Sequence, residues 1–391
     1  MTNRQIVHMD LDGFFVNCTL LKMPDLVGKP LIIGGNSSRG VVTSASIEAK
    51  KYGVQTAMPI RYALQLCPDA KVISGDYDLF THYSNTVNEI INEKAPVLER
   101  AAIDEFYMDV SGMDRFHDSF GFTSELVQKV QKETGLKMSY GLSVNKTVAK
   151  MCTNYAKPNG KYKVAEKQVQ PFMDPQSIRK LPTVGDVTFK LLRRISIKVI
   201  RTLRELPAVS MQELMGKSGL SLWNKANGID LTPVVPFHDR KAIAEQFTFD
   251  SDTQNLPELK ATLITMVEKT AFEMRAEKML CSSLTVKIRY SNRDTETKQV
   301  RVAFTSNDEL LIEKALELLD KLYQRRILIR MIGVKLSHFV YGHQQIDLFN
   351  DTTKLINLYQ AMDKMKHRFN DPSLIRRAIG VPAKSKINLQ R

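Results

Sequence analysis

The stretch AAIDEFYMDV, residues 101–110, places two adjacent acids inside a run of apolar residues that favour β-structure. Side chains alternate along a strand, so neighbours within it point to opposite faces of the sheet. At a hairpin tip or a strand's first residue, however, two adjacent acids can converge on one side. Adjacent carboxylates repel, and a nearby cation or strong hydrogen bonds make them tolerable. Two interpretations stay open for Asp104 and Glu105: a solvated β-turn, which Asp favours, or half of a metal site.

A second acidic segment lies far upstream, in IVHMDLDGFF, residues 6–15. It also begins as an apolar strand and ends in acids followed by a glycine. A Mg²⁺ ion takes oxygen ligands in an octahedron, commonly one or two carboxylates together with substrate phosphates. Two such strand ends lying side by side would form a platform for metal ions. The two segments together therefore favour a metal site over a turn.

The order of predicted elements gives the fold class. Strands are predicted at 4–10, 97–103, 106–110 and 138–143, and helices at 77–93, 123–134 and 145–155. With residues 16–75 set aside, this order is the β-α-β-β-α-β of a ferredoxin-like split βαβ arrangement. Both acidic strand ends then fall on its central strands. Residues 16–75, with short strands at 31–33 and 41–43 and helices at 47–52 and 59–66, become an insertion after the first strand.

The second half of the chain has a different character. Residues 167–231 read as short helices rich in cations, with a Gly turn at Gly185 of the kind that binds phosphate. A solvated basic face is the alternative there. Residues 232–241, with two prolines, predict a linker. Residues 242–340 form another α/β unit, with helices at 257–277 and 308–324 and a basic, alternating strand at 285–290.

Length, charge and cysteine spacing limit the functions that this chain could have. A length of 391 residues predicts more than one domain. The net charge of +14 favours a nucleic-acid partner over an anionic membrane surface, although a basic protein without such a partner stays possible. The four cysteines have no CxxC spacing, which argues against zinc and fits a reducing cytosol. No apolar signal stretch or membrane span is predicted.

Four motifs carry a resemblance to a known family: HMDLDGFF (8–15), SIEAKKYGV (46–54), IDE (103–105) and AKPNG (156–160). They resemble the Y-family DNA polymerases, the translesion enzymes of the DinB and UmuC type, over about residues 4–349. The resemblance implies an α+β chain with a ferredoxin-like palm at 1–15 and 76–166 and inserted fingers at 16–75. It also implies a thumb of helix-hairpin-helix type at 167–231, a linker at 232–241 and a separate α/β little finger at 242–340.

The resemblance implies a two-metal active site. Asp10 and Asp104 would bridge two Mg²⁺ ions, Leu11 would lend a main-chain carbonyl to one of them, and Glu105 would complete the ligand shell of the second ion, near the primer 3′-OH. One ion makes the 3′-OH a better nucleophile and the other holds the triphosphate. The resemblance places Asp10, Asp104 and Glu105 as catalytic residues.

Other residue roles also follow from the resemblance. Nucleotide-binding residues would be Phe14, Phe15, Ser44, Lys50 and Lys157, with Phe15 as the steric gate that excludes a 2′-OH. Without the motif, a core aromatic would be the preferred interpretation of Phe15. DNA-binding residues would be Arg193, Arg194, Lys198, Lys287 and Arg289.

The chain departs from the family pattern at several positions. Ile47 and Lys50 stand where the fingers usually carry Tyr and Arg, so a hydroxyl donor and a bidentate fork are lost. Ala102, Ala242 and Ala244 stand where serines are frequent.

The segment QIDLF, residues 345–349, resembles the bacterial sliding-clamp-binding pentapeptide. Gln345 would hydrogen-bond to the clamp, while Leu348 and Phe349 would fill an apolar groove. An ordinary amphipathic segment is the alternative. A basic tail follows within residues 341–391, an arrangement closer to UmuC-type members than to DinB.

The prediction is a template-directed DNA polymerase that copies past lesions with low fidelity and low processivity. It would be a monomer in the bacterial cytoplasm, associated with the nucleoid, and would bind primer–template DNA, dNTP and the sliding clamp but no membrane. Two alternatives stay open: a nucleotide cyclase, which also uses a split βαβ palm and two metal-binding carboxylates, and a catalytically silent, clamp-tethered DNA-binding protein.

Overall fold

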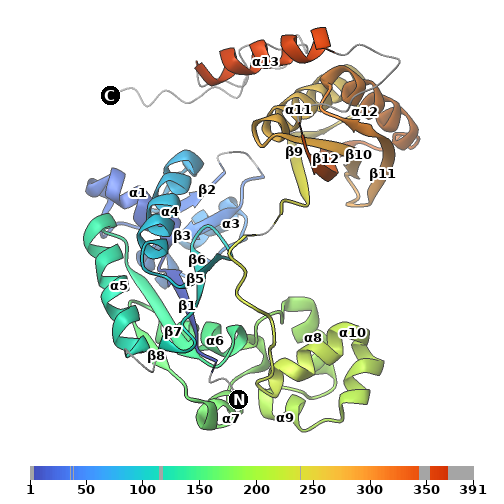
Figure 1. The fold of residues 1–391 in the computed structure, drawn as a ribbon. Coiled ribbons are helices and arrows are strands. Elements are labelled where there is room, and N and C mark those ends of the chain that lie inside the picture. Colours follow the sequence, from blue (N-terminus) through green and yellow to red (C-terminus); the bar gives the residue numbers. More distant parts are fainter. Residues whose placement is uncertain are drawn as a thin grey trace. The chain divides into compact units, whose positions relative to one another are not determined.

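The computed structural model describes residues 4–35, 37, 39–113, 118–237, 239–342 and 353–368. The chain forms two compact units, Met1–His238 and Asp239–Arg391, which are described separately (Figure 1). Across the described residues, no helix is both long and apolar enough to cross a membrane.

The first unit is built on a five-stranded sheet in the order β5-β6-β1-β7-β8. Its strands are β1 (Ile6–Leu11), β5 (Val97–Arg100), β6 (Glu105–Asp109), β7 (Met138–Ser143) and β8 (Lys161–Lys163). With α4 (Tyr77–Asn92) and α5 (Ser119–Thr134), the order β1-α4-β5-β6-α5-β7 confirms the ferredoxin-like prediction. The acidic strand ends lie on β1 and β6, which are neighbours inside the sheet, as expected.

Two boundaries differ from the prediction. β5 ends at Arg100 instead of residue 103, so residues 101–104 form the hairpin tip. The Ser84 hydroxyl of α4 donates to the Ile103 carbonyl and anchors this tip. Helix α5 begins at Ser119, four residues earlier than expected, because the Asp118 side chain accepts hydrogen bonds from the first-turn N–H groups of Phe120 and Gly121.

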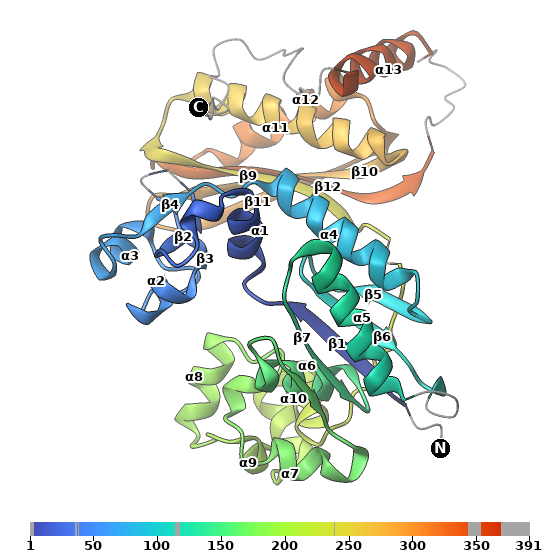
Figure 2. The ribbon, with the colours of Figure 1, turned by 90° about the vertical axis from the view of Figure 1, so that its left-hand side faces the viewer.

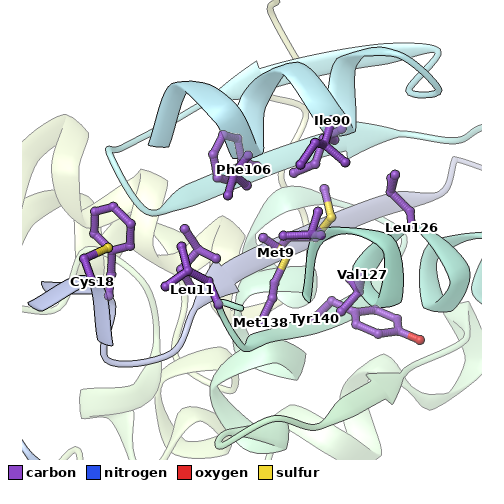
Figure 3. Close-up of a cluster of buried hydrophobic side chains, with 14 of the residues drawn as sticks. Met9, Leu11, Cys18, Ile90, Phe106, Leu126, Val127, Met138 and Tyr140 are labelled. Carbon is purple, nitrogen blue, oxygen red and sulfur yellow. The ribbon is translucent and has the colours of Figure 1, made fainter. Parts of the chain in front are cut away.

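Helices cover the two faces of this sheet unequally. α4 and α5 lie side by side on one face, where Met9, Leu11 and Phe106 contribute to the main hydrophobic core (Figures 2 and 3). The other face, covered by α6 (Lys146–Ala156), carries His8 and Asp10 of β1. Alternation along β1 therefore separates an apolar face from a polar one.

Residues 14–73 contain α1 (Phe14–Lys22), the 3₁₀ turn η1 (Pro24–Leu26), α2 (Ile47–Lys51) and α3 (Ile60–Leu66), with a three-stranded sheet of order β3-β2-β4. The strands are β2 (Leu31–Gly34), β3 (Val42–Ala45) and β4 (Lys71–Ile73). A small core of Ile32, Val42 and Ala49 holds these elements together. The Ser46 hydroxyl caps α2 by accepting from the Ala49 N–H.

Residues 166–226 are short helices: η3 (Glu166–Gln168), α7 (Val169–Met173), η4 (Ile178–Lys180), α8 (Asp186–Arg194), α9 (Ile200–Arg204) and α10 (Ala208–Ala226). Their core continues into α6 through Val148 and Met151, which pack with Ile178, Leu192 and Ile200.

The chain then runs back along the palm. The Asp230 carboxylate accepts from both the N–H and the hydroxyl of Thr147, and the Val235 N–H donates to Glu99 Oε2 at 2.6 Å. The first residues of the segment expected to be a linker are thus held on the palm.

The second unit is a four-stranded antiparallel sheet in the order β11-β10-β12-β9, with α11 and α12 packed on one face. The strands are β9 (Ala242–Thr253), β10 (Met279–Tyr290), β11 (Thr295–Thr305) and β12 (Ile329–Tyr341), and the helices are α11 (Leu256–Ala276) and α12 (Asp308–Leu322). A further helix, α13 (Thr353–Arg368), joins the unit through a bidentate ion pair from Arg275 Nε and Nη2 to Asp363, at 2.7 and 3.0 Å.

Candidate active site

Three carboxylates meet where β1 ends and β6 begins. Asp10 and Glu105 are direct partners in the antiparallel pairing of these strands. The Leu11 N–H donates to the Asp104 carbonyl at 3.0 Å, which ties the hairpin tip to β1. Asp104 belongs to the tip and Glu105 begins the strand, so the two adjacent acids escape the strict alternation of a continuous strand.

The pKa values of Asp10 and Asp104 are both raised. Burial raises the pKa of Asp10 to about 6, although Lys157 Nζ lies 2.5 Å from its carboxylate and opposes the rise. Burial also raises the pKa of Asp104, and the neighbouring Glu105 adds to the effect. Among the described residues, Asp104 has no cation within ion-pair distance, whereas Asp10 and Glu105 each have one. An additional positive charge would stabilise both aspartates in their ionised forms.

Glu105 is held by two donors. The His8 ring, with Nε2 at 3.6 Å from Oε1, and Lys150, with Nζ at 2.7 and 2.9 Å from the two carboxylate oxygens, lower the Glu105 pKa to about 2. The His8 separation is longer than a standard hydrogen bond, so we regard it as an electrostatic contact. Glu105 is therefore ionised at neutral pH.

These side chains fit a divalent cation. Their donors are carboxylate oxygens, which Mg²⁺ prefers. Leu11 follows Asp10 and buries its side chain in the core, so only its main-chain atoms are available to the site. The described residues contain no group of three His, Cys, Asp or Glu side chains already arranged to hold a metal ion, and lysines lie beside Asp10 and Glu105. An incoming cation would thus replace the two ammonium groups as the counter-charge.

Comparison with known proteins gives the family. Residues 9–154 match the impB/mucB/samB family, and residues 240–348 match the C-terminal domain of the same family. The chain is 32% identical to DNA polymerase IV of Dehalococcoides mccartyi (strain CBDB1), over 96% of this chain and 97% of that protein. It is 33% identical to DNA polymerase IV of Desulfatibacillum aliphaticivorans, over 94% and 95%.

A solved structure agrees with these relatives. The Y-family DNA polymerase chimera Dbh-Dpo4(243-245)-Dbh superposes with a TM-score of 0.79 at 25% identity, covering 86% of this chain and all of the other. The chain belongs to the Y family of DNA polymerases. It is a DNA-directed DNA polymerase of the translesion type, and its reaction is a metal-dependent nucleotidyl transfer. The nucleotide cyclase is thereby excluded.

The residues predicted to bind the nucleotide are spread over the first unit of this Y-family polymerase. Phe14 is buried, while the half-buried Phe15 packs edge-on against Phe80, with ring centroids 4.8 Å apart. Lys157 reaches the acids directly through Asp10. Ser44 is half-buried in β3. Lys50 is exposed on α2, and neither Ser44 nor Lys50 has a recorded contact with the three acids.

Two of the residues that depart from the family pattern, Ile47 and Lys50, are exposed on α2. Ile47, at the start of α2, has 64% of its surface exposed, and Lys50 lies nearly one turn further along the same helix.

The predicted DNA-binding residues fall on exposed or half-buried positions. Arg193, Arg194 and Lys198 are exposed at and after the end of α8, and the Arg193 guanidinium lies 5.7 Å from the Phe189 ring centroid. In the second unit, Lys287 and Arg289 alternate on β10 with the buried Val286 and Ile288 and so point away from the helices.

Strand register reveals two further cations on this open face, which sequence reasoning missed. Arg301 of β11 pairs with Ser283, and Lys335 of β12 pairs with Thr285. The residues that share the face by register are Ser283, Thr285, Lys287, Arg289, Thr295, Thr297, Gln299, Arg301, Met331, Gly333, Lys335, Ser337, Ala242, Ala244, Gln246 and Thr248, and none of them is acidic. Period-2 alternation identifies such positions once the register is known.

His8 and Lys150 were also missed as partners of Glu105. Both contacts depend on how α6 packs on the sheet, which sequence spacing does not encode. The predicted clamp-binding residues Gln345, Leu348 and Phe349 lie outside the described residues.

Proposed function

We propose that Asp10, Asp104 and Glu105 bind two Mg²⁺ ions and that this site joins a dNTP to the 3′-OH of a primer on template DNA. The single observation that carries the proposal is the pairing of partly buried carboxylates on adjacent strand ends, two of them with a raised pKa. When bound, the ions would activate the 3′-OH and neutralise charge on the triphosphate.

Two lysines have a second role in this proposal. Lys157 pairs with Asp10 and Lys150 with Glu105, and about a third of each lysine side chain is exposed. Each can turn from its carboxylate to a phosphate oxygen of the incoming nucleotide when metal neutralises the acids. A lysine so placed stabilises the charge that develops on the phosphoryl oxygens. Neutralisation of the acids is therefore coupled to binding of the triphosphate.

Phe15 is proposed to exclude ribonucleotides. Its ring is fixed by Phe80, Phe14 and Tyr77, with centroid distances of 4.8, 5.5 and 6.4 Å. A ring that cannot move aside leaves no room for a 2′-OH on the sugar above it. Phe14, Ser44 and Lys50 are proposed to complete the nucleotide site together with Lys157.

DNA binding is proposed to be mainly electrostatic. The open face of the second unit, whose register-paired residues include no acid, offers Lys287, Arg289, Arg301 and Lys335, and the thumb offers Arg193, Arg194 and Lys198. Cations on a smooth surface contact phosphates and read little sequence. The affinity for primer–template DNA should then fall steeply with salt, and charge reversal at Arg193 and Arg194 should flatten that slope.

Residues 345–349 are proposed to bind a bacterial sliding clamp, with the chain acting as a monomer at the nucleoid in the cytoplasm. Removal of Leu348 and Phe349 would delete two apolar groups worth roughly 1.5–3 kcal/mol each. The L348A/F349A variant should lose stimulation by a loaded clamp and keep unassisted extension. If a chain truncated after Asn350 loses stimulation and the double variant keeps it, the basic tail is the tether instead.

Primer extension tests the proposed reaction. The full chain is incubated with Mg²⁺, dNTPs and primers annealed to an undamaged template or to one carrying an abasic site. Extension on both templates, dependent on added metal, is the expected result. DNA binding without extension would instead identify a catalytically silent DNA-binding protein.

A further inference from the structure

His8 is a fully buried polar ring that lies beside Glu105 but is not itself one of the proposed metal ligands. It lies in β1 between Tyr107 of β6 and Gly141 of β7, on the face that carries Asp10. Its ring centroid is 4.7 Å from that of Tyr107. Burying an imidazole costs free energy unless both ring nitrogens find partners, so its surroundings need an explanation.

The two ring nitrogens face two different elements. Nδ1 lies 2.9 Å from the hydroxyl of Thr153 on α6. Nε2 faces Glu105 Oε1 at 3.6 Å and has no closer hydrogen-bond partner among the described residues. The ring therefore bridges α6 and the carboxylate proposed to bind metal.

Gly141 makes this bridge possible. A Cβ at Gly141 would lie 2.5 Å from the Ala149 carbonyl and 2.5 Å from Cys152 Cβ, so only glycine allows α6 to pack this closely on the sheet. The close approach brings Thr153 to the His8 ring and Lys150, three residues earlier on α6, to Glu105.

Two neighbours of the His8 ring, the Thr153 hydroxyl and the Glu105 carboxylate, bear on which ring nitrogen carries the hydrogen. The hydroxyl has one hydrogen to donate, and its neighbours are His8 Nδ1 at 2.9 Å and the carbonyls of His8 and Ala149 at 2.9 and 3.1 Å. Donation to Nδ1 leaves the ring hydrogen on Nε2, where it faces the Glu105 carboxylate. The opposite tautomer would direct a nitrogen lone pair at that anion, which electrostatics disfavours.

We propose that His8 and Thr153 are positioning residues that fix the Glu105 carboxylate for metal binding. Thr153 sets the tautomer of His8, and the Nε2–H of His8 orients one oxygen of Glu105, so the carboxylate keeps its orientation when Lys150 turns to the nucleotide. The inference rests on the proposed function, because it takes Glu105 as a metal ligand. Groups that orient metal ligands are typically worth 10- to 100-fold in metal affinity.

Mn²⁺ binding measured by electron paramagnetic resonance tests the proposal without relying on turnover. The full chain is assembled with a dideoxy-terminated primer–template and the matching dNTP, and free Mn²⁺ is titrated. Thr153→Val keeps the shape of the side chain and removes its hydroxyl, and it should weaken Mn²⁺ binding by about 10-fold or more. Thr123→Val is the matched control, since Thr123 is also fully buried and donates to the carbonyl four residues earlier, in a helix away from the acids.

Two histidine variants separate positioning from packing. His8→Gln retains an N–H donor close to the Nε2 position, whereas His8→Leu retains only bulk. Mn²⁺ affinity should be nearer wild type in the glutamine variant and weakened in the leucine variant. Equal affinities for wild type, Thr153→Val and Thr123→Val would overturn the inference, whatever the folding of the His8 variants.

The proposed metal site has its own control in the same titration. Glu105→Gln should weaken Mn²⁺ binding at least as strongly as Thr153→Val. If Glu105→Gln binds Mn²⁺ like wild type, the assignment of Glu105 as a ligand fails. If Glu105→Gln weakens binding and Thr153→Val does not, the ligand assignment stands and only the positioning role fails.

Discussion

Asp10→Asn should stabilise the metal-free protein while it abolishes activity. Burial raises the pKa of Asp10 from 3.8 to about 6, so the folded state holds its proton more tightly than the unfolded state does. A tenfold change in proton affinity is about 1.4 kcal/mol, so ionised Asp10 costs about 3 kcal/mol of the free energy of unfolding. The neutral amide removes that cost and can still accept a hydrogen bond from Lys157.

The upward direction of the Asp10 pKa shift determines how the stability gain of Asp10→Asn depends on pH. The raised pKa means that protonated Asp10 has no cost below about pH 4 and that the cost grows as the pH rises through 6. The advantage of Asp10→Asn should therefore be about half its full value at pH 5 and complete above about pH 7. Added Mg²⁺ should reduce the difference in the free energy of unfolding between Asp10→Asn and wild type, because it stabilises the folded wild type by binding to it.

Denaturant unfolding in EDTA, followed by the fluorescence of the single tryptophan, is the appropriate assay. Trp223 lies in the first unit, where its indole N–H donates to the Leu206 carbonyl, so it reports on the unit that holds Asp10. Asp12→Ala, which removes an acceptor at a neighbouring acid, is the control with the opposite sign. The Asp12 carboxylate accepts from the Ser139 hydroxyl at 2.7 Å and the Asn159 N–H at 2.8 Å, so its loss should cost about 1–2 kcal/mol. An Asp10→Asn protein that is less stable than wild type at pH 7.5 would refute the reasoning.

Three further predictions follow from the packing. Phe15→Ala should raise ribonucleotide insertion strongly and slow dNTP insertion less in single-nucleotide assays; unchanged NTP use would make Phe15 a core residue. Lys146→Met should cost about 3–5 kcal/mol, because it leaves the buried Glu99 without the ammonium 2.5 Å away, whereas Lys129→Met at a more exposed pair should cost less than about 1 kcal/mol. Arg275→Ala should speed amide hydrogen exchange in α13 without affecting β10; unchanged exchange would mean that the ion pair does not hold the helix.

Much of the palm could be predicted from local chemistry. Apolar runs ending in acids locate β1 and the tip before β6, because alternation and turn preference are local properties. The early start of α5 depends on one capping side chain, Asp118, whose significance appears only once its hydrogen bonds are seen. The short β5 is accompanied by an anchor on α4: Ser84, 19 residues before Ile103, donates to the Ile103 carbonyl in the hairpin tip.

The contacts around Glu105 could not be predicted. They need α6 to lie against Gly141, and the approach of a helix to a sheet is a tertiary property that spacing does not encode. The same limit applies to Arg301 and Lys335, which join Lys287 only through the register of three strands. Similarly, the prolines predict a linker at 232–241 but not the hydrogen bond that the Val235 N–H donates to Glu99 of β5.

Asp104→Ala tests whether the acids where β1 ends and β6 begins carry the metal-dependent transfer. Single-nucleotide insertion and primer–template affinity are measured on the same preparation of wild type and variant. Because Asp104 is a proposed metal ligand and makes no proposed phosphate contact, insertion should be abolished while DNA affinity stays within about twofold of wild type. Insertion at a rate near that of wild type would contradict the account.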